Sequence, residues 1–163
     1  MSKGYEAIDR QAVEALYRRY GAAVQRRART LMGSDAAAAD AVQEVFIRVL
    51  DHYDRFRGES SPMTWLYRVT TNLCLNRLRD ERRRGELLQQ VDRAEPPSGR
   101  RIEMSPDVRR LLCELSPKIA AAGVYYHLDG MSHQEIAAAL EVSRRTVGNL
   151  VARFDREMKK RLR

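Results

Sequence analysis

Two stretches of this chain carry side chains suited to binding a polyanion. Arginines crowd residues 77–84, and a second group of arginines follows Ser143. Aromatic and amide side chains, among them Phe56 and Asn72, precede the first group. Guanidinium groups bind phosphates, amides bond to base edges, and aromatic faces stack on unpaired bases. These residue types together favour a nucleic acid as the partner.

Residues for catalysis or metal binding do not occur in recognisable arrangements. The chain has no glycine-rich phosphate loop and no HExxH motif, and its histidines lack metal-ligand spacing. Cys74 and Cys113 form no CxxC pair, so no zinc site is expected and a reduced, cytoplasmic compartment is predicted. We therefore predict no enzymatic activity, no metal and no cofactor.

The overall charge supports a polyanionic partner. Lys and Arg total 30 against 22 Asp and Glu, which gives a net charge of +8 over 163 residues. Nucleic acid is the leading interpretation and an anionic membrane surface the second. No run of 18 apolar residues predicts a transmembrane helix, and the first residues contain no apolar signal core.

These side chains must be positioned by helices, because apolar residues recur every three or four positions along most of the chain. The expected helices span residues 9–32, 35–53, 62–84, 106–115, 117–128, 133–140 and 143–161. Serine and proline pairs predict several helix starts, and Ser132 with Glu135 forms a capping box. No segment shows the alternation of apolar and polar residues that indicates a β-strand, so the predicted fold is all-α.

The helical pattern is interrupted once, between Gly85 and Ser105. This segment contains Pro96-Pro97-Ser98-Gly99 and charges of both signs, which is typical of a flexible linker. We expect two small helical domains, residues 1–84 and 106–163, joined by the linker 85–105.

Charge is segregated between the helices of the first domain. Residues 35–54 carry one basic side chain, Arg48, and five acidic side chains. The acidic residues are Asp35, Asp40, Glu44, Asp51 and Asp54. Residues 62–84 carry six arginines against two acidic side chains: Arg68, Arg77, Arg79, Arg82, Arg83 and Arg84 against Asp80 and Glu81. A solvated surface normally mixes both signs, so this separation predicts one basic partner and one anionic partner.

The second domain is expected to contain a helix-turn-helix. A short helix over 133–140, a turn at Glu141-Val142 and a longer basic helix match that motif. Many helix-turn-helix motifs have a left-handed glycine at the turn position that Glu141 occupies here. Because a residue with a side chain is strained in the left-handed conformation, we expect this turn to have a different backbone shape. The residues expected to face outward are Arg144, Arg145, Thr146, Asn149 and Arg153. The alternative is an ordinary helical hairpin with a solvated basic face.

Two motifs of the first domain resemble a known family. Asp40-Ala41-Val42-Gln43-Glu44-Val45-Phe46 is similar to the core-binding signature of bacterial sigma factors. Phe56-Arg57-Gly58-Glu59-Ser60, followed by Thr64-Trp65-Leu66-Tyr67-Arg68, resembles their promoter-opening region. With two domains and a short linker, the chain resembles the extracytoplasmic-function (ECF) group. The resemblance covers about residues 10–84 and 112–160.

The resemblance implies a transcription initiation factor, and it implies three interfaces. The residues implied in docking on the largest subunit of core RNA polymerase are Asp40, Gln43, Glu44 and Phe46. Those implied at the −10 element are Phe56 and Asn72, which would hold a flipped base, and Arg77, Arg79, Arg82, Arg83 and Arg84, which would bind phosphates. Those implied at the −35 element are Ser143, Arg144, Arg145, Thr146, Asn149 and Arg153. An anti-sigma factor is a further implied partner, and no small-molecule substrate is implied.

The chain departs from the family pattern at two places. Gly148 replaces the usual basic or polar residue two positions after Thr146, so base reading is expected to shift to Arg144, Arg145 and Asn149. The stretch Lys118–Gly123 lacks the bulky, charged pattern common there. Two other functions stay open from the sequence: a dimeric stand-alone helix-turn-helix regulator, and a helical adaptor that does not bind DNA.

Overall fold

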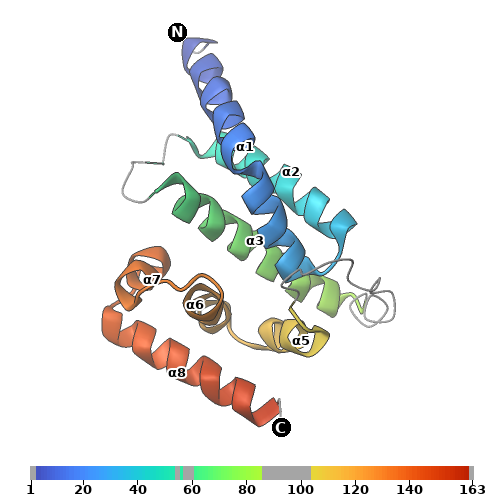
Figure 1. Ribbon diagram of the computed structural model, residues 1–163, viewed down its shortest axis with the longest axis vertical. Helices are drawn as coiled ribbons and strands as arrows, with labels where there is room; N and C mark the ends of the chain where they lie inside the picture. Colours follow the sequence, from blue (N-terminus) through green and yellow to red (C-terminus); the bar gives the residue numbers. More distant parts are fainter. Residues whose placement is uncertain (1–2, 54–55, 57–60, 86–103, 162–163) are drawn as a thin grey trace. The chain divides into compact units, whose positions relative to one another are not determined.

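The chain is helical in the part that the computed structural model describes, which is residues 3–53, 56, 61–85 and 104–161. Seven helices and no strand occur in these residues, so the all-α prediction is confirmed (Figure 1). They divide into two compact units, Met1–Cys74 and Leu75–Arg163. Most of the predicted linker, residues 86–103, lies outside the described residues.

The first unit is built from α1 (Lys3–Met32), α2 (Asp35–Asp51) and the first half of α3 (Pro62–Arg83). The last turns of α3 belong to the second unit. Helix α1 begins six residues earlier than the pattern predicted, because residues 5–8 contain no glycine or proline that would end a helix. The other helix boundaries lie within two residues of those predicted.

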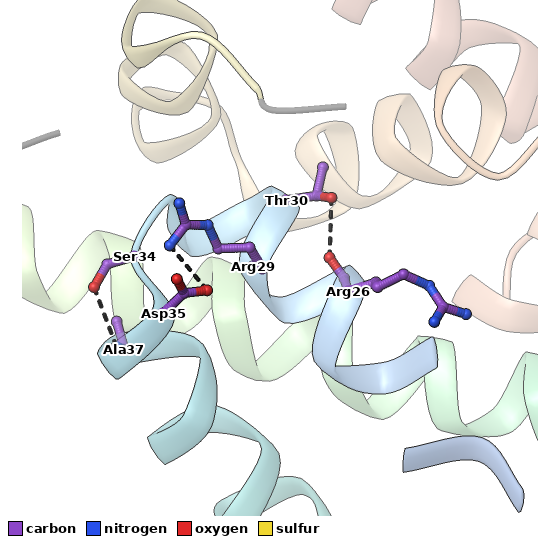
Figure 2. Close-up of polar contacts among 6 residues, drawn as sticks. All are labelled: Arg26, Arg29, Thr30, Ser34, Asp35 and Ala37. Atoms are coloured by element: carbon purple, nitrogen blue, oxygen red, sulfur yellow. Dashed lines mark hydrogen bonds and ion pairs between the residues drawn. The ribbon is translucent and has the colours of Figure 1, made fainter. Parts of the chain in front are cut away.

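Local signals place α2 directly after α1. Gly33 has a φ of 75°, and its N–H donates to the carbonyl of Arg29 at 2.8 Å, which ends α1. The Ser34 hydroxyl then accepts the N–H of Ala37 at 3.4 Å and caps α2. Figure 2 shows this connection, with Asp35 turned back to Arg29 at 3.0 Å. This connection of two residues is capped at both ends, and it turns the chain back so that α2 packs along α1.

The core of the first unit lies where α1, α2 and α3 face one another. Its fully or nearly fully buried apolar side chains are Val24, Ala28, Leu31, Ala38, Val45, Val49, Leu66, Leu73 and Cys74. Ala28, Ala38 and Cys74 are the small members of this core, and they allow the helices to approach closely. The outer face of each helix is left for polar residues.

The second unit contains α5 (Pro106–Glu114), α6 (Pro117–His127), α7 (His133–Leu140) and α8 (Arg144–Arg161). The predicted capping box is confirmed: Glu135 N–H donates to the Ser132 hydroxyl at 3.3 Å, and the Glu135 carboxylate accepts the Ser132 N–H at 2.8 Å. Hydrogen bonds that the Ser132 side chain and backbone N–H make to the carboxylate lower the pKa of Glu135, although the side chain is open to solvent. The box fixes where the first helix of the helix-turn-helix begins.

The turn between α7 and α8 corrects one expectation. Glu141 has φ 53° and ψ 51°, so it adopts the left-handed conformation that its side chain was expected to prevent. The N–H groups of Glu141 and Val142 both bond the Ala137 carbonyl, the second at 3.0 Å. These bonds, together with the packing of α7 on α8, offset a backbone strain of about 1–2 kcal/mol.

Helix α8 packs against α6 at a glycine. A Cβ added to Gly123 would overlap the ring of Phe154, which is itself buried. The small-residue stretch Ile119–Gly123, part of the segment that departs from the family pattern, is buried along its whole length. At Gly123 the departure therefore has a structural reason, because the Phe154 ring occupies the volume that a side chain there would need.

We expect Gly123→Ala to lower the free energy of unfolding of the second unit by about 1–3 kcal/mol, because the added methyl group overpacks the α6–α8 contact. The measurement is urea unfolding followed by circular dichroism.

The matched control is Gly21→Ala in α1, where an added Cβ would lie 3.5 Å from the Tyr17 ring in ordinary contact. This variant should be as stable as the parent or more stable, since alanine favours helix over glycine by about 1 kcal/mol. Combining Gly123→Ala with Phe154→Leu should restore part of the loss. A Gly123→Ala variant as stable as the parent would contradict the packing described.

Candidate nucleic-acid and protein interfaces

The outer face of α2 carries the acidic side chains that the sequence singled out. Asp40 and Gln43 are exposed, and Glu44 is half-buried with its carboxylate 2.5 Å from Arg48. Because these positions are three, four and eight residues apart, they share one face of the helix. The face is therefore polar and largely acidic, with Arg48 at its edge.

Phe46 does not lie on that face. It is only 9% exposed, and Tyr17 of α1 covers it in an edge-on contact with ring centroids 5.0 Å apart. The ring that a partner would meet first is Tyr17, which is 55% exposed. Phe46 thus supports the α1–α2 surface from below.

Ile47 is an apolar residue on the acidic face that the sequence reasoning missed. Its side chain is 59% exposed and lies one turn after Glu44. A helical wheel of residues 35–51 would have found it, because Ile47 departs from the apolar stripe that contains Val42, Val45 and Val49. The surface defined by Asp40, Gln43, Glu44, Ile47 and Tyr17 is called the acidic face below.

The aromatic and amide residues of the first unit gather on one side of α3. Phe56 is half-buried and stacks on Trp65, with ring centroids 4.7 Å apart and planes inclined by 27°. Asn72 lies two turns after Trp65 and is exposed. Residues seven apart share a helix face, so the stacked pair and the Asn72 amide present neighbouring surfaces. Residues 57–60 of the resembling motif lie outside the described residues.

A buried guanidinium connects α1 to this part of α3. Arg27 is 6% exposed, and its Nε and Nη2 donate to the Thr71 hydroxyl at 3.2 and 2.9 Å. The same guanidinium lies over the ring of Tyr67, 4.9 Å from its centroid. Arg27 was not singled out from the sequence, where it is one of many arginines. Its contacts set the position of α3 against α1, and with it the face that carries Trp65 and Asn72.

The arginines of the second half of α3 differ in exposure. Arg82, Arg83 and Arg84 are exposed, whereas Arg77 and Arg79 are half-buried. Burial lowers the pKa of the Arg79 guanidinium, which donates to the Asn76 side chain at 3.2 Å. Arg82 pairs with Glu114 at 2.8 Å and Arg83 with Asp80 at 3.8 Å, so carboxylates of the protein hold two of the three exposed cations at the end of α3. The preceding turn holds its cations closer to the protein.

The helix-turn-helix presents a basic stripe along α8. Val147, Val151 and Phe154 are buried, whereas Arg144, Arg145, Asn149 and Arg153 are all exposed. Five exposed side chains of α8 are spaced three or four residues apart, so they form one row along the helix. This row, called the recognition stripe below, consists of Arg145, Asn149, Arg153, Arg156 and Lys160. Arg156 and Lys160 were not predicted, although continuing the same spacing along the sequence would have found them.

Ser143 and Thr146 serve the structure of α8 directly. The Ser143 hydroxyl accepts the N–H of Thr146 at 3.1 Å and lies 2.8 Å from the Thr146 hydroxyl. These bonds cap the start of α8. Ser143 is exposed and Thr146 half-buried, so both lie beside the recognition stripe.

Membrane-spanning helices and metal-ligand clusters are both absent from the described part of the chain. No helix there is long and apolar enough to cross a membrane. Nor do three or more His, Cys, Asp or Glu side chains gather in those residues as a metal-binding group would.

Two family models match the chain, and they cover different halves of it. The model for Sigma-70 region 2 matches residues 16–84, and the model for Sigma-70, region 4 matches residues 106–153. The first match contains the acidic face and α3, and the second contains the helix-turn-helix.

Curated relatives match the chain across both regions. The ECF RNA polymerase sigma factor SigE of Mycolicibacterium smegmatis is 33% identical over 157 residues, which cover 90% of this chain and 60% of the relative. The ECF RNA polymerase sigma factor SigM of Mycobacterium tuberculosis is 30% identical over 149 residues, which cover 90% of this chain and 75% of the relative. The chain thus spans about three fifths of the length of the first and three quarters of the second.

One solved structure shares the fold. It is the co-crystal structure of the sigma factor RpoE in complex with the anti-sigma factor NepR from Bartonella quintana. The TM-score is 0.56 at 21% identity, and the match covers 94% of this chain and 95% of the other.

The buried bond between Arg27 and Thr71 can be tested by removing its acceptor. Thr71→Val keeps the side-chain volume but leaves two guanidinium N–H groups without that oxygen. We expect the free energy of unfolding of the first unit to fall by about 1–3 kcal/mol. Urea unfolding followed by Trp65 fluorescence measures this.

Thr30→Val is the matched control for Thr71→Val. The Thr30 hydroxyl donates to the Arg26 carbonyl of its own helix at 3.0 Å, as Figure 2 shows. This variant should change the free energy of unfolding by less than about 0.5 kcal/mol. Equal effects of the two substitutions would mean that the buried guanidinium does not depend on Thr71.

Proposed function

This chain belongs to the sigma-70 family, in its ECF group, and we propose that it directs bacterial RNA polymerase to specific promoters and helps to open them. The separation of charge carries this proposal. An acidic face on α2 is suited to a basic protein surface, whereas the exposed arginines of α3 and α8 are suited to phosphates. A protein that must bind a polymerase and DNA at once needs both surfaces.

We assign one role to each part of the chain. Residues 1–84 bind core polymerase and the −10 element, residues 106–163 bind the −35 element, and residues 85–105 link them. Bacterial RNA polymerase acts on the chromosome, so the proposed compartment is the cytoplasm. An anti-sigma factor is a further partner that we propose. The chain catalyses no reaction itself; it supplies binding energy to the polymerase complex.

Docking on core polymerase is assigned to the acidic face. Asp40 and Gln43 are free to meet a partner, and Glu44 can exchange its contact with Arg48 for a partner cation. Ile47 and Tyr17 add exposed apolar area beside these charges. Charged rims around an apolar centre are typical of protein interfaces, in which the charges set orientation and the apolar area adds affinity.

Promoter opening is assigned to α3 and the segment before it. The Phe56–Trp65 stack offers an aromatic surface on which an unpaired base can stack, and Asn72 offers an amide for its edge. These contacts exist only with a separated strand, so they favour the open complex over duplex DNA. The exposed arginines that end α3 are assigned to the phosphates of the same strand.

The −35 element is assigned to the recognition stripe of α8. In a helix-turn-helix the second helix lies in the major groove and the first crosses the backbone. Arg145 and Asn149 are exposed within the first two turns of α8, so they are the side chains that we assign to base edges. Arg144 and Arg153 are assigned to phosphates.

Runoff transcription tests the docking assignment, with core polymerase, duplex promoter fragments and this chain as the sole specificity factor. The parent chain should give discrete transcripts. Asp40→Arg combined with Glu44→Arg should remove them and weaken pull-down of core polymerase about tenfold or more, because like charges then face the basic partner. The variant should stay folded, since Asp40 is exposed and Glu44 only half-buried.

The charge-matched control is Asp107→Arg combined with Glu141→Arg, two exposed positions in the second unit. It should bind core polymerase as the parent does. Equal binding by all three proteins would overturn the assignment of the acidic face. Binding of a palindromic duplex by the chain alone, with no transcripts, would instead indicate a stand-alone regulator.

Phe56→Ala and Asn72→Ala should each reduce open-complex formation more than closed-complex binding. Loss of a stacking surface costs about 1–3 kcal/mol per base, and loss of the amide removes hydrogen bonds to a base edge. Permanganate reactivity of unpaired thymines measures opening, and competitor-resistant binding at low temperature measures the closed complex.

Phe56→Tyr and Gln11→Ala are the controls for these two changes. The first keeps an aromatic ring over Trp65, and the second removes an exposed amide from α1. Both should open promoters nearly as well as the parent. If alanine at 56 or 72 lowers both steps equally, that residue has a structural role only.

A further inference from the structure

The outer face of α1 carries charges that neither the polymerase assignment nor the DNA assignments use. Between residues 10 and 26, the exposed charged side chains of this helix are four arginines and one glutamate: Arg10, Glu14, Arg18, Arg19 and Arg26. Arg18 donates to Glu14 at 2.5 Å, so these two charges compensate each other. The remaining exposed charges are positive, which makes this face of the first unit basic.

Small residues form a row along the middle of this face. Ala15 and Ala22 are exposed and lie seven residues apart. Gln11 and Arg18, also exposed and seven apart, alternate with them at steps of four and three. One α-helix packs along another with this spacing, and small side chains let the two helices approach closely. The face therefore has the residue spacing of a helix-packing surface.

The face is hollowed at the first of these alanines. Gln11, Glu14, Ala15, Arg18 and Arg19 line the hollow. It forms because the methyl group of Ala15 is much shorter than the four side chains around it. In paired helices a side chain of one helix enters such a hole on the other.

The cations beside the alanine row determine which kind of helix fits. Arg19 lies over the Tyr20 ring, 5.4 Å from its centroid, and Figure 2 shows the Arg26 side chain extending away from the ion pair of Arg29 and Asp35. Arg19 and Arg26 are seven residues apart, a rise of about 10 Å along the helix. Carboxylates seven residues apart on a second helix have the same spacing, and such flanking charges select the partner of a helix pair.

We propose that the outer face of α1 docks an acidic helix of a protein partner. Small or apolar side chains of that helix contact Ala15 and Ala22, and its carboxylates pair with Arg19 and Arg26. A nucleic acid would also attract the arginines, but its phosphate strand has no side chain to enter the hollow at the alanine row. Tyr17 of the acidic face lies on the opposite side of α1, so the two surfaces are separate.

The test measures binding of a synthetic peptide to the full chain by fluorescence anisotropy. The probe is a helical peptide of about four heptads, with alanine and leucine along its packing row and glutamate at the flanking positions. Arg19→Glu combined with Arg26→Glu should weaken binding about tenfold or more, because like charges then meet. A second peptide with lysine in place of each glutamate should bind this variant more tightly than the parent.

The charge-matched control is Arg110→Glu combined with Lys118→Glu, two exposed positions of the second unit. It changes the net charge by the same amount, and it should bind the glutamate peptide within about twofold of the parent, because screening weakens the effect of distant surface charges.

Substitution of an alanine separates close packing from a general attraction of charge. Ala22→Arg adds a positive charge but fills the row along which the partner helix packs, so it should weaken binding about tenfold. Attraction by charge alone would instead strengthen it. Ala152→Arg, at an exposed alanine of α8, is the matched control and should bind the peptide as the parent does.

Two results would overturn the proposal. One is unchanged peptide binding after charge reversal on α1, and the other is tighter binding by Ala22→Arg. A single-stranded DNA of mixed sequence is the second probe. If charge reversal at Arg19 and Arg26 weakens DNA binding more than peptide binding, α1 binds nucleic acid and the proposal fails. Circular dichroism should show every variant folded, and none of these outcomes depends on the assignment of the chain to RNA polymerase.

Discussion

Burial of an apolar stripe on helices whose other side faces solvent, α2 and α8 above all, is the constraint on which the rest of this structure depends. Val45 and Val49 point α2 at the core of the first unit, and Val147 and Val151 do the same for α8 in the second. Once these stripes are buried, the opposite side of each helix has to face solvent. The acidic face of α2 and the recognition stripe of α8 are therefore consequences of packing as much as of composition.

The cores are small, so a few special contacts determine how the helices meet. In the first unit a buried guanidinium bonds Thr71 and lies over Tyr67, which fixes α3 relative to α1. In the second unit Gly123 lets the Phe154 ring lie directly against α6. Each contact lies under a helix that we assign to DNA. We expect a substitution at Thr71 or Gly123 to shift the neighbouring helix without altering any residue that we assign to DNA.

The two glycines of the second unit illustrate different uses of a missing side chain. At Gly123 the absent Cβ makes room inside the core, and the Phe154 ring occupies the place that the Cβ would take. At Gly148 the absent Cβ leaves space at the surface, and among the described residues a Cβ there would meet only the edge of His133, at 3.9 Å. Packing therefore explains the first glycine, whereas the described neighbours of the second do not require one.

The sequence by itself determined the helices, the helix-turn-helix and the separation of charge, because these depend on caps, breakers and periodicity within a few neighbouring residues. Ser105, which precedes Pro106, and the Ser132–Glu135 box cap helices as predicted. Only the tertiary structure decided that Tyr17 covers Phe46, that Phe56 stacks on Trp65 and that Glu141 adopts the left-handed turn. Each of these outcomes depends on which surface of one element meets another. The hydrogen bonds and packing that offset local strain are likewise contacts between elements. Periodicity along the chain does not specify such contacts, because it describes each element separately.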